Sequence, residues 1–450
     1  MTPVVTPVVT RPATSWRRAR GVEVTLFLVT FLVFGATASR TYISYDVWTS
    51  NLASYELATT GSPYIDGLDV PDLEHHPLRW VWIDDDAPNG HVVITRAPAV
   101  VIAGLPAYLL TQPDSMTVLP AAITAALLTA TAVLLMYLAL LHLMRRRHAL
   151  IAAAAFGFTT PVWSVAANGI WPQTITVLGI ALAAWAAVRE KWWTVGLGGI
   201  LMLWARPHAA LIVAVLGLTL AWRRRSLGIA LRTGLPGVVS LAPLALWTHW
   251  VYGTWNPTAL YGAGALSEVH KSLLDLPNQA GMWISPDRGL LIYTPALLLL
   301  LPTLIRTWRT LPDWATALLL GGLAYTVLQA ALIGFTGGDP IYGYRYGLEL
   351  LTCATPAYAL ATPRAHRTTR LLLAPVLGLQ LVVILLGATL EHTALTYQQA
   401  WTHNAFVEAL LDAPIRLPLA LLVVVAVTAA ARRLGPPTPA EPVDEPVRVG

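Results

Sequence analysis

Charged residues and cysteine are scarce in this chain of 450 residues. Only 12% of the residues are charged, against about 25% in a soluble globular chain, and 56% are hydrophobic. The mean hydropathy is +0.59. The one cysteine, Cys353, excludes a disulfide within the chain, so cysteine usage does not indicate the compartment. The scarcity of charge excludes an ordinary soluble domain.

Several motifs of soluble enzymes are also missing. The sequence has no Gly-Lys-Ser/Thr phosphate loop, no His-Glu-x-x-His and no Gly-x-Ser-x-Gly. These absences argue against an ATP-driven pump. Lysine is nearly absent as well, with Lys191 and Lys271 the only two among 29 basic residues. Together with the many alanines, this usage suggests a GC-rich genome, and we infer an actinobacterial source.

Long apolar runs dominate the remainder of the sequence. Each run approaches the roughly 20 residues that a helix needs to cross the hydrocarbon core, and lipid-exposed backbone must satisfy its own hydrogen bonds. We therefore predict an all-α integral membrane protein with about twelve transmembrane helices. The predicted helices are 22–38, 117–143, 149–167, 174–188, 192–205, 209–222, 231–251, 290–305, 314–335, 346–363, 371–390 and 415–431.

The distribution of charge predicts the orientation of these helices. With both termini in the cytoplasm, 21 of the 29 basic residues lie inside, whereas 18 of the 24 acidic residues lie outside. Such a split follows the positive-inside rule. We expect a cytoplasmic tail at 1–21, a transmembrane domain at 22–433 and a disordered cytoplasmic tail at 434–450 of a plasma-membrane protein.

Two segments admit other interpretations. Residues 98–111 are apolar but short and contain two prolines, so we interpret them as a re-entrant or interfacial segment of the first outer loop. The first apolar run follows "RRAR" and ends in "ATAS", a pattern that a cleaved signal peptide also shows. We favour a retained first helix.

The outer loops hold most of the residues that could do chemistry. The first covers 39–116, the second 252–289 and a third 336–345. The inner loops are short and basic. A site built from carboxylates, histidines and aromatic residues therefore faces outward.

Asp46, in "RTYISYDVWTS", is the first candidate. A carboxylate at the membrane boundary among aromatic residues is partly desolvated, which would raise its basicity and suit a general base. The alternative is a helix N-cap, a common role for aspartate. On residue type alone the N-cap is favoured.

Arg288 in "SPDRG" and Arg345 in "YGYRYG" are the next candidates. Both lie on the outer face, against the positive-inside trend. A guanidinium can bind phosphate oxygens and stabilise charge on a phosphate leaving group. The alternative is a salt bridge to a neighbouring aspartate or snorkelling to lipid headgroups.

Weaker candidates for the lining of the site come from the same loops. Adjacent histidines on an extended chain point apart, which makes the His pair in "DLEHHP" a weak metal signal. The "DDD" run at 84–86 could bind Mg²⁺ or Mn²⁺, although a solvated loop is the simpler interpretation. The outer aromatic residues could stack on a sugar or form an interfacial belt. These candidates are His75, His76, Arg206, His208, Tyr252, Trp255, Tyr261 and Tyr344.

Four segments in order resemble the GT-C superfamily of membrane glycosyltransferases. They are the acidic residue after the first helix (Asp46), "GHVVITRAPAVVIAGLPAYLL", "VYGTWNPTALYG" with "GMWISPDRGLLIYTPALLLLLP", and "GGDPIYGYRYGLELL". In the last segment, Tyr344 stands where the family has proline.

The resemblance implies a polyprenyl-phosphate sugar donor and inverting transfer to a cell-envelope glycan, glycolipid or protein. It implies Asp46 as base and Arg288 and Arg345 as ligands of the donor phosphate. For an actinobacterium the sugar would be mannose or arabinose. Because Val47 follows Asp46, a second carboxylate must come from elsewhere, which leaves a divalent cation open. The rival functions are a transporter or lipid flippase and a glycan polymerase or ligase that uses lipid pyrophosphate.

Overall fold

The computed structural model describes residues 15–41, 44–76, 79–261, 272–336, 341–390 and 398–434. Within these ranges the chain is mainly helical, and one short antiparallel pair of strands, β1 (Ile83–Asp84) and β2 (Val93–Ile94), is present. The predicted tails at 1–14 and after Leu434 lie outside the described residues, as do 262–271 of the second outer loop and 337–340 of the third.

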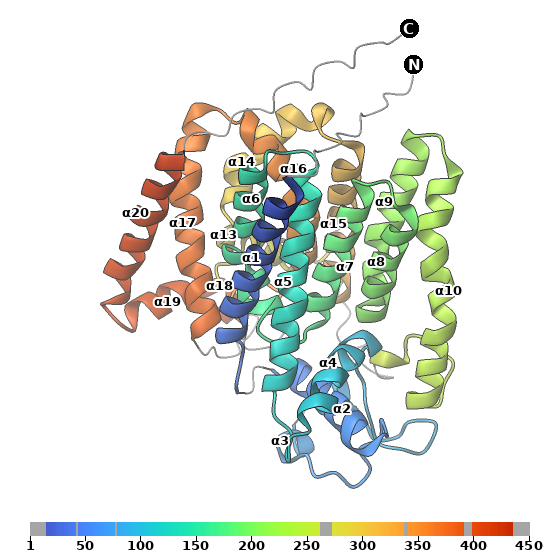
Figure 1. Ribbon diagram of the computed structural model, residues 1–450. Coiled ribbons are helices and arrows are strands. Elements are labelled where there is room, and N and C mark those ends of the chain that lie inside the picture. Colours follow the sequence, from blue (N-terminus) through green and yellow to red (C-terminus); the bar gives the residue numbers. More distant parts are fainter. Residues whose placement is uncertain are drawn as a thin grey trace.

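Long helices stack side by side and form the body of the molecule (Figure 1). They are α1 (Ser15–Ala36), α5 (Leu119–Leu141), α6 (Arg146–Phe158), α7 (Pro172–Ala187), α8 (Trp192–Ala205), α9 (Ala210–Arg223), α10 (Leu227–Tyr252), α14 (Ala296–Thr307), α15 (Asp313–Leu332), α16 (Leu348–Ala361), α17 (Arg367–Thr389) and α20 (Arg416–Leu434).

Short helices cover one end of this stack and join its members. They are α2 (Tyr45–Thr60), α3 (Pro71–Glu74), η1 (Arg79–Val81), α4 (Pro98–Thr111), η2 (Val162–Ala166), η3 (Pro207–Ala209), η4 (Ala259–Tyr261), α12 (Leu276–Ile284), α13 (Leu290–Tyr293), η5 (Trp308–Thr310), η6 (Thr362–Arg364), α18 (Gln399–Thr402) and α19 (Ala405–Leu411).

Every predicted helix coincides with a helix of the structure, but several boundaries differ. The first begins at Ser15, not at 22. The predicted helix 149–167 is divided into α6 and the π-helical turn η2, with Pro161 between them. The predicted helix 290–305 is divided into α13 and α14 at Pro295. Proline lacks the N–H that a continuous helix uses, which explains why both breaks occur where they do.

Fewer helices qualify as membrane spans than the twelve that we predicted. Among the described residues, α5, α10, α15 and α17 are long and apolar enough to cross a membrane. Counting α19 and α20 as one bent span, with 115° between them, gives up to five. The number twelve stays a prediction. The outward faces agree with a lipid environment, because α10 exposes Leu235, Val238, Val239 and Leu246.

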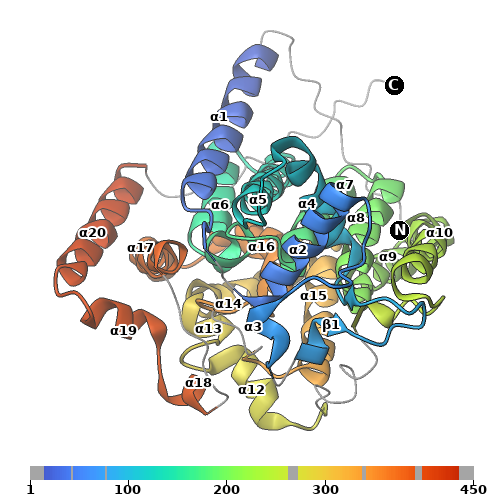
Figure 2. The same ribbon diagram turned by 90° about the horizontal axis from the view of Figure 1, so that it is seen from below.

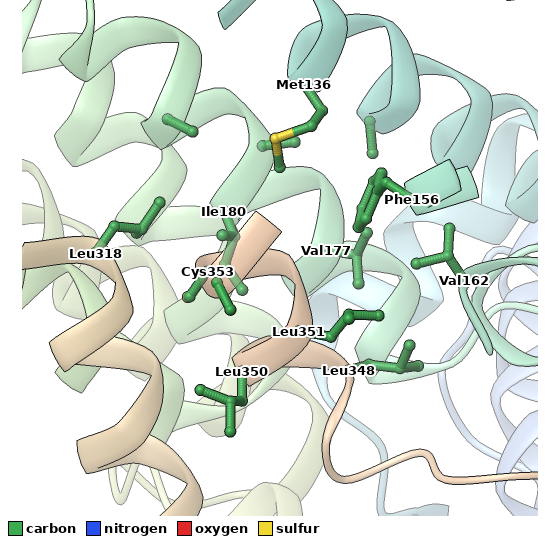
Figure 3. Close-up of a cluster of buried hydrophobic side chains, with 14 of the residues drawn as sticks. Met136, Phe156, Val162, Val177, Ile180, Leu318, Leu348, Leu350, Leu351 and Cys353 are labelled. Carbon is green, nitrogen blue, oxygen red and sulfur yellow. The ribbon is translucent and has the colours of Figure 1, made fainter. Parts of the chain in front are cut away.

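The interior of the stack centres on α7. Figure 3 shows Val177 and Ile180 of α7 facing side chains from four other helices. Met136 comes from α5, Phe156 from α6, Leu318 from α15, and Leu348, Leu350, Leu351 and Cys353 from α16. The only cysteine of the chain is thus fully buried in an apolar core.

The first outer loop folds into an outer module, whose core it shares with residues of α5, α7, α8 and α10. Figures 1 and 2 show α2, α3, α4 and the strand β1 together beneath one end of the stack. Leu52, Ile83, Val93 and Tyr108 are buried within this module. The segment 98–111 forms the helix α4, whose 14 residues are fewer than a span needs, and its re-entrant or interfacial placement stays a prediction.

The first residues of α1 and the last residues of α20 lie at the opposite end from this outer module (Figure 1). Since both predicted tails continue from these helix ends, the arrangement agrees with two termini on one side. The basic loops also begin there, at the junctions of α5 with α6 and of α9 with α10.

Glycine permits a close approach of the helices α7 and α8. A Cβ built on Gly198 of α8 would lie 2.6 Å from the carbonyl oxygen of Gly179 of α7, and one on Gly179 would lie 2.8 Å from the carbonyl oxygen of Gly198. Small residues at such contacts let membrane helices pack backbone to backbone.

We therefore expect Gly198→Val to force α7 and α8 apart and to destabilise the protein by about 1–3 kcal/mol. Thermal unfolding of the purified protein in detergent measures the effect. Gly234→Val on α10 is the matched control, because nothing lies within 4 Å of the added Cβ there. Equal melting temperatures for the two variants would show that the contact is not tight.

Candidate active site

Asp46 lies in the first turn of α2. The helix begins at Tyr45, and its N-cap is Ser44, whose Oγ accepts a hydrogen bond from the Val47 N–H at 3.3 Å. The interpretation of Asp46 as the N-cap is therefore wrong by two residues. In the first turn the carboxylate benefits from the positive end of the helix dipole, and it stays free to contact other elements.

Three groups from separate segments hold the Asp46 carboxylate. Arg345 Nη1 donates to Oδ2 at 2.7 Å. Arg96 Nη2 donates to Oδ1 at 2.8 Å, and Trp82 Nε1 donates to the same oxygen at 2.9 Å. The side chain of Asp46 is 24% exposed, against 13% for Arg96 and 3% for Arg345. One carboxylate thus lies between two guanidinium groups at the junction of the outer module and the helix stack.

This arrangement makes Asp46 a weaker base than the sequence suggested. Burial alone would raise the pKa of Asp46. The charges of Arg96 and Arg345, with the Trp82 hydrogen bond, outweigh burial and hold the pKa of this carboxyl well below its ordinary value. Our expectation of raised basicity is therefore wrong for the protein in this state. The pair of arginines also leaves a net positive charge around the site.

Aromatic rings fix the position of Arg345. Its guanidinium lies 4.9 Å from the centre of the Trp171 ring and 4.7 Å from that of Tyr346, and Nη2 donates to the Tyr346 hydroxyl at 2.7 Å. Contacts of this kind stabilise a cation more strongly when water is excluded. A guanidinium held in this way is suited to bind an anion.

Hydrogen bonds fix the position of Arg96. Its Nε donates to Thr49 Oγ1 at 2.8 Å. Its backbone N–H donates to the Tyr252 hydroxyl at 3.2 Å, and that hydroxyl donates to the Arg96 carbonyl at 2.8 Å. Tyr252 therefore supports the segment that carries Arg96, from the end of α10.

Sequence reasoning missed Arg96 and Trp82 as site residues. The criterion that singled out Arg345 applies equally to Arg96, because it is an outer arginine that precedes the short apolar helix α4 by two residues. Trp82 carried no comparable signal, since an interfacial belt explains most outer tryptophans.

A buried polar network continues from Arg345 into the stack. The Arg206 guanidinium lies 5.1 Å from the centre of the Tyr346 ring, and its Nη1 donates to Tyr325 at 3.1 Å and to Gln329 at 3.0 Å. His208 contacts the same Gln329 oxygen at 2.6 Å. Arg206 and His208, two of the predicted lining residues, thus lie behind Arg345 and not around Asp46.

A second acidic residue belongs to this interior. Glu349, in the first turn of α16, is fully buried, and its Oε1 accepts from Thr176 Oγ1 at 2.9 Å. The sequence analysis gave Glu349 no role. Ionisable residues inside a membrane stack are functional candidates by default, and this one lies near the arginines.

Arg288 has a different set of partners. Its Nε lies 3.1 Å from Oδ2 of Asp287, and its Nη1 donates to the Ile341 carbonyl. Asp287 Oδ1 in turn accepts from the N–H of Ala405, at the start of α19. These contacts fasten the segment that leads to Arg345, and the salt bridge that we considered as the alternative is present. The role of Arg288 as a phosphate ligand stays a prediction.

The other predicted lining residues are dispersed. The His76 ring packs edge-on to Trp82, with centroids 5.3 Å apart, which places His76 next to a ligand of Asp46. His75 is exposed. Trp255 stacks on His249, and Tyr344 is buried with its hydroxyl 2.7 Å from Thr294 Oγ1. The Tyr261 side chain lies outside the described residues.

No group of three or more metal-binding side chains occurs among the described residues. In this arrangement both oxygens of Asp46 contact guanidinium groups, so a cation would have to displace an arginine to bind there. The expected Mg²⁺ or Mn²⁺ site stays a prediction.

Comparison with known proteins shows a likeness of fold. ArnT from Cupriavidus metallidurans bound to undecaprenyl phosphate aligns with a TM-score of 0.52, covering 94% of this chain and 75% of that chain at 15% identity. The same protein in the apo state gives a TM-score of 0.50, 16% identity and coverages of 92% and 75%. No family model matches the chain, and no curated protein matches its sequence.

The archaeal oligosaccharyltransferase AglB from Archaeoglobus fulgidus, in complex with an inhibitory peptide and a dolichol-phosphate, aligns less well. Its TM-score is 0.48 at 13% identity, covering 95% of this chain and 57% of that chain, which is too low to support an argument. The chain has helices that are long and apolar enough to cross a membrane, and its fold resembles that of ArnT.

The partners of Arg288 lead to a prediction. We expect Arg288→Gln to lower the melting temperature, because it leaves the buried Asp287 carboxylate without its cation. Arg288→Lys keeps the charge and should recover part of the stability. Thermal unfolding measures both variants. A wild-type melting temperature for Arg288→Gln, with weakened binding of undecaprenyl phosphate, would instead identify Arg288 as a phosphate ligand.

Proposed function

We propose that the protein is a membrane glycosyltransferase that takes a sugar from a polyprenyl-phosphate donor on the extracytoplasmic face. The observation that carries the proposal is the convergence of Arg96 and Arg345 on Asp46, at distances of 2.8 and 2.7 Å. This chemistry requires a base for the acceptor and cations for the leaving phosphate. Asp46 could serve as the base and Arg96 and Arg345 as the cations, and the three side chains are in direct contact. The ArnT-like fold supports the same class.

The reaction would be a single displacement. Asp46 removes the proton from an acceptor hydroxyl, whose oxygen attacks the anomeric carbon while the bond from that carbon to the phosphate oxygen breaks. The configuration at this carbon inverts, and polyprenyl phosphate leaves with the electron pair. Arg345 and Arg96 stabilise the charge that develops on the phosphate, and such preorganised donors lower the barrier most where water is excluded. The proton on Asp46 then passes to water.

Donor binding would also activate Asp46. In the structure Arg345 contacts the Asp46 carboxylate, and its charge lowers the pKa of Asp46. A phosphate that takes over Arg345 removes one cation from Asp46 and adds a negative charge nearby. Both changes raise the pKa of the carboxyl and make it a better base. The enzyme would then be basic at this position only when its donor is bound.

The sidedness of the site follows from the charge distribution. The arginine-rich loops lie at the end of the stack opposite the outer module. Because basic loops usually stay in the cytoplasm, this arrangement supports a position of Asp46 and the arginines on the extracytoplasmic side of the plasma membrane. The proposed reaction requires that the site be reached by a lipid-linked donor from the bilayer and by an acceptor from the outer side.

The finer assignments rest on the sequence. An actinobacterial source would favour mannose or arabinose as the sugar and a cell-wall glycan, glycolipid or protein as the acceptor. The main rival, a transporter or flippase, requires charges near the bilayer midplane. Arg206 and Glu349 are buried charges that such a protein could use, so the assay must separate transfer from transport. A lipid-pyrophosphate polymerase or ligase differs in the donor alone.

The test of the function uses reconstituted protein, radiolabelled polyprenyl-phosphate sugar and crude acceptor lipids. We expect sugar transfer by the wild type and a loss of about 10²–10⁴-fold in Asp46→Asn, since general base catalysis contributes that much. Asp66→Asn, in the same outer module but paired with His91, is the control. Transfer that survives Asp46→Asn would remove Asp46 as the base, and flipping of the labelled lipid without transfer would favour the flippase.

Activation by the donor predicts a difference between two pH profiles. The profile of kcat/KM reports the free enzyme, in which Asp46 is a very weak base, whereas kcat reports the donor complex. We therefore expect the acid limb of kcat to lie at higher pH than that of kcat/KM. Arg345→Gln removes the cation without any donor and should bring the two limbs together. Limbs that already coincide in the wild type would contradict the exchange of Arg345.

A further inference from the structure

An apolar crevice lies between five helices on the side of the molecule away from α8, α9 and α10. It has a volume of about 740 Å³, within the range of roughly 300–1,000 Å³ that accommodates a ligand. The helices are α6, α14, α16, α17 and α20. Apolar side chains form its walls, among them Ile151, Phe156, Leu297, Leu300, Leu377 and Val427.

Arginines line one end of this crevice. Arg147 lies at the start of α6, Arg367 and Arg370 lie in the first turn of α17, and Arg432 lies in the last turn of α20. No acidic residue is part of the lining. Within the described part of the chain none of these four arginines forms an ion pair, and the buried Nε of Arg370 has no hydrogen-bond partner.

Three of these arginines lie where the helix dipole favours an anion. Arg147, Arg367 and Arg370 lie at helix N-termini, where the helix dipole already presents positive charge and favours anions over cations. Two helix N-termini and four arginines therefore lie at one end of an apolar crevice, with Arg370 half-buried and Arg147, Arg367 and Arg432 exposed. Backbone N–H groups at helix N-termini and arginine side chains both bind phosphate.

The positive-inside rule explains why arginines occur at this end of the stack, but not why they surround a crevice. Arg232 and Arg309 belong to the same set of predicted cytoplasmic arginines and do not line it. The crevice reaches from the arginines to Thr160 and Gln380, between walls that would otherwise pack against each other. Its shape and chemistry match a lipid with a phosphate at one end and a hydrocarbon chain.

We propose that this crevice binds an anionic phospholipid from the cytoplasmic leaflet. The headgroup phosphate contacts Arg367 and Arg370, with Arg147 and Arg432 beside it, and an acyl chain lies between α6, α17 and α20. This site is separate from the proposed donor site, which lies at the end where the outer module covers the stack. The lipid fills the space between α20 and the other helices and so attaches the C-terminal helix to the stack.

Native mass spectrometry of the full-length protein in detergent tests the proposal, with phosphatidylglycerol and phosphatidylcholine as probes. We expect phosphatidylglycerol to remain bound to the wild type and phosphatidylcholine to be lost. Arg367→Gln with Arg370→Gln should weaken phosphatidylglycerol binding at least tenfold. The matched control, Arg232→Gln with Arg309→Gln, removes the same charge outside the crevice and should leave binding unchanged.

A second pair of variants tests the apolar part of the crevice without altering charge. Ala374→Phe places a ring in the crevice and should reduce phosphatidylglycerol binding, whereas Leu379→Phe on the exposed face of α17 should not. Melting temperatures confirm that each variant is folded, and Arg432→Gln replaces the arginine pair if that pair does not fold. Three results would overturn the proposal. They are an equal loss of phosphatidylglycerol binding in the two double arginine variants, unchanged binding in Ala374→Phe, and a preference for undecaprenyl phosphate over phosphatidylglycerol.

Discussion

The ion pair between Asp46 and Arg345 joins two residues that are 299 positions apart, and the candidate site depends on it. Asp46 comes from the outer module and Arg345 from the segment before α16. Because Arg96 contacts the other carboxylate oxygen, the pair also fixes the entrance to α4 against the start of α2. One carboxylate between two guanidinium groups leaves one positive charge in excess. A phosphate could take the place of the carboxylate beside these arginines. Breaking such a buried pair costs several kcal/mol unless a new partner takes over. A donor phosphate would be such a partner.

The rest of the fold supports this contact in separate ways. Tyr252 binds the backbone of Arg96 from the end of α10, and Trp171 and Tyr346 hold the guanidinium of Arg345 between aromatic rings. Arg288 and Asp287 fasten the segment that precedes Arg345. These residues hold the two arginines or the segment before Arg345, and Trp82 contacts the carboxylate itself. The geometry of the site is thus determined mainly by how the two arginines are held, and the apolar crevice lies apart from all of these contacts.

The sequence predicted the helices and two of the three charged site residues, for reasons that are physical. Long apolar runs specify helices by length and composition alone. Asp46 stood out because it follows the first helix among aromatic residues, and Arg345 because basic residues on the outer face are uncommon. Arg96 met the same criterion and was missed because α4 had been interpreted as a loop segment, not as a helix with an outer arginine before it. The pKa of Asp46 was predicted with the wrong sign. Partial burial was visible in the sequence, but the long-range approach of Arg345 was not.

The account depends on a donor phosphate that replaces Asp46 as the partner of Arg345. The most direct measurement is an experimental structure of the protein with undecaprenyl phosphate bound. The account predicts a phosphate oxygen within hydrogen-bond distance of the Arg345 guanidinium and the Asp46 carboxylate turned away from it, with the 2.7 Å contact between the two lost. A phosphate bound elsewhere, with the Asp46–Arg345 pair intact, would contradict it.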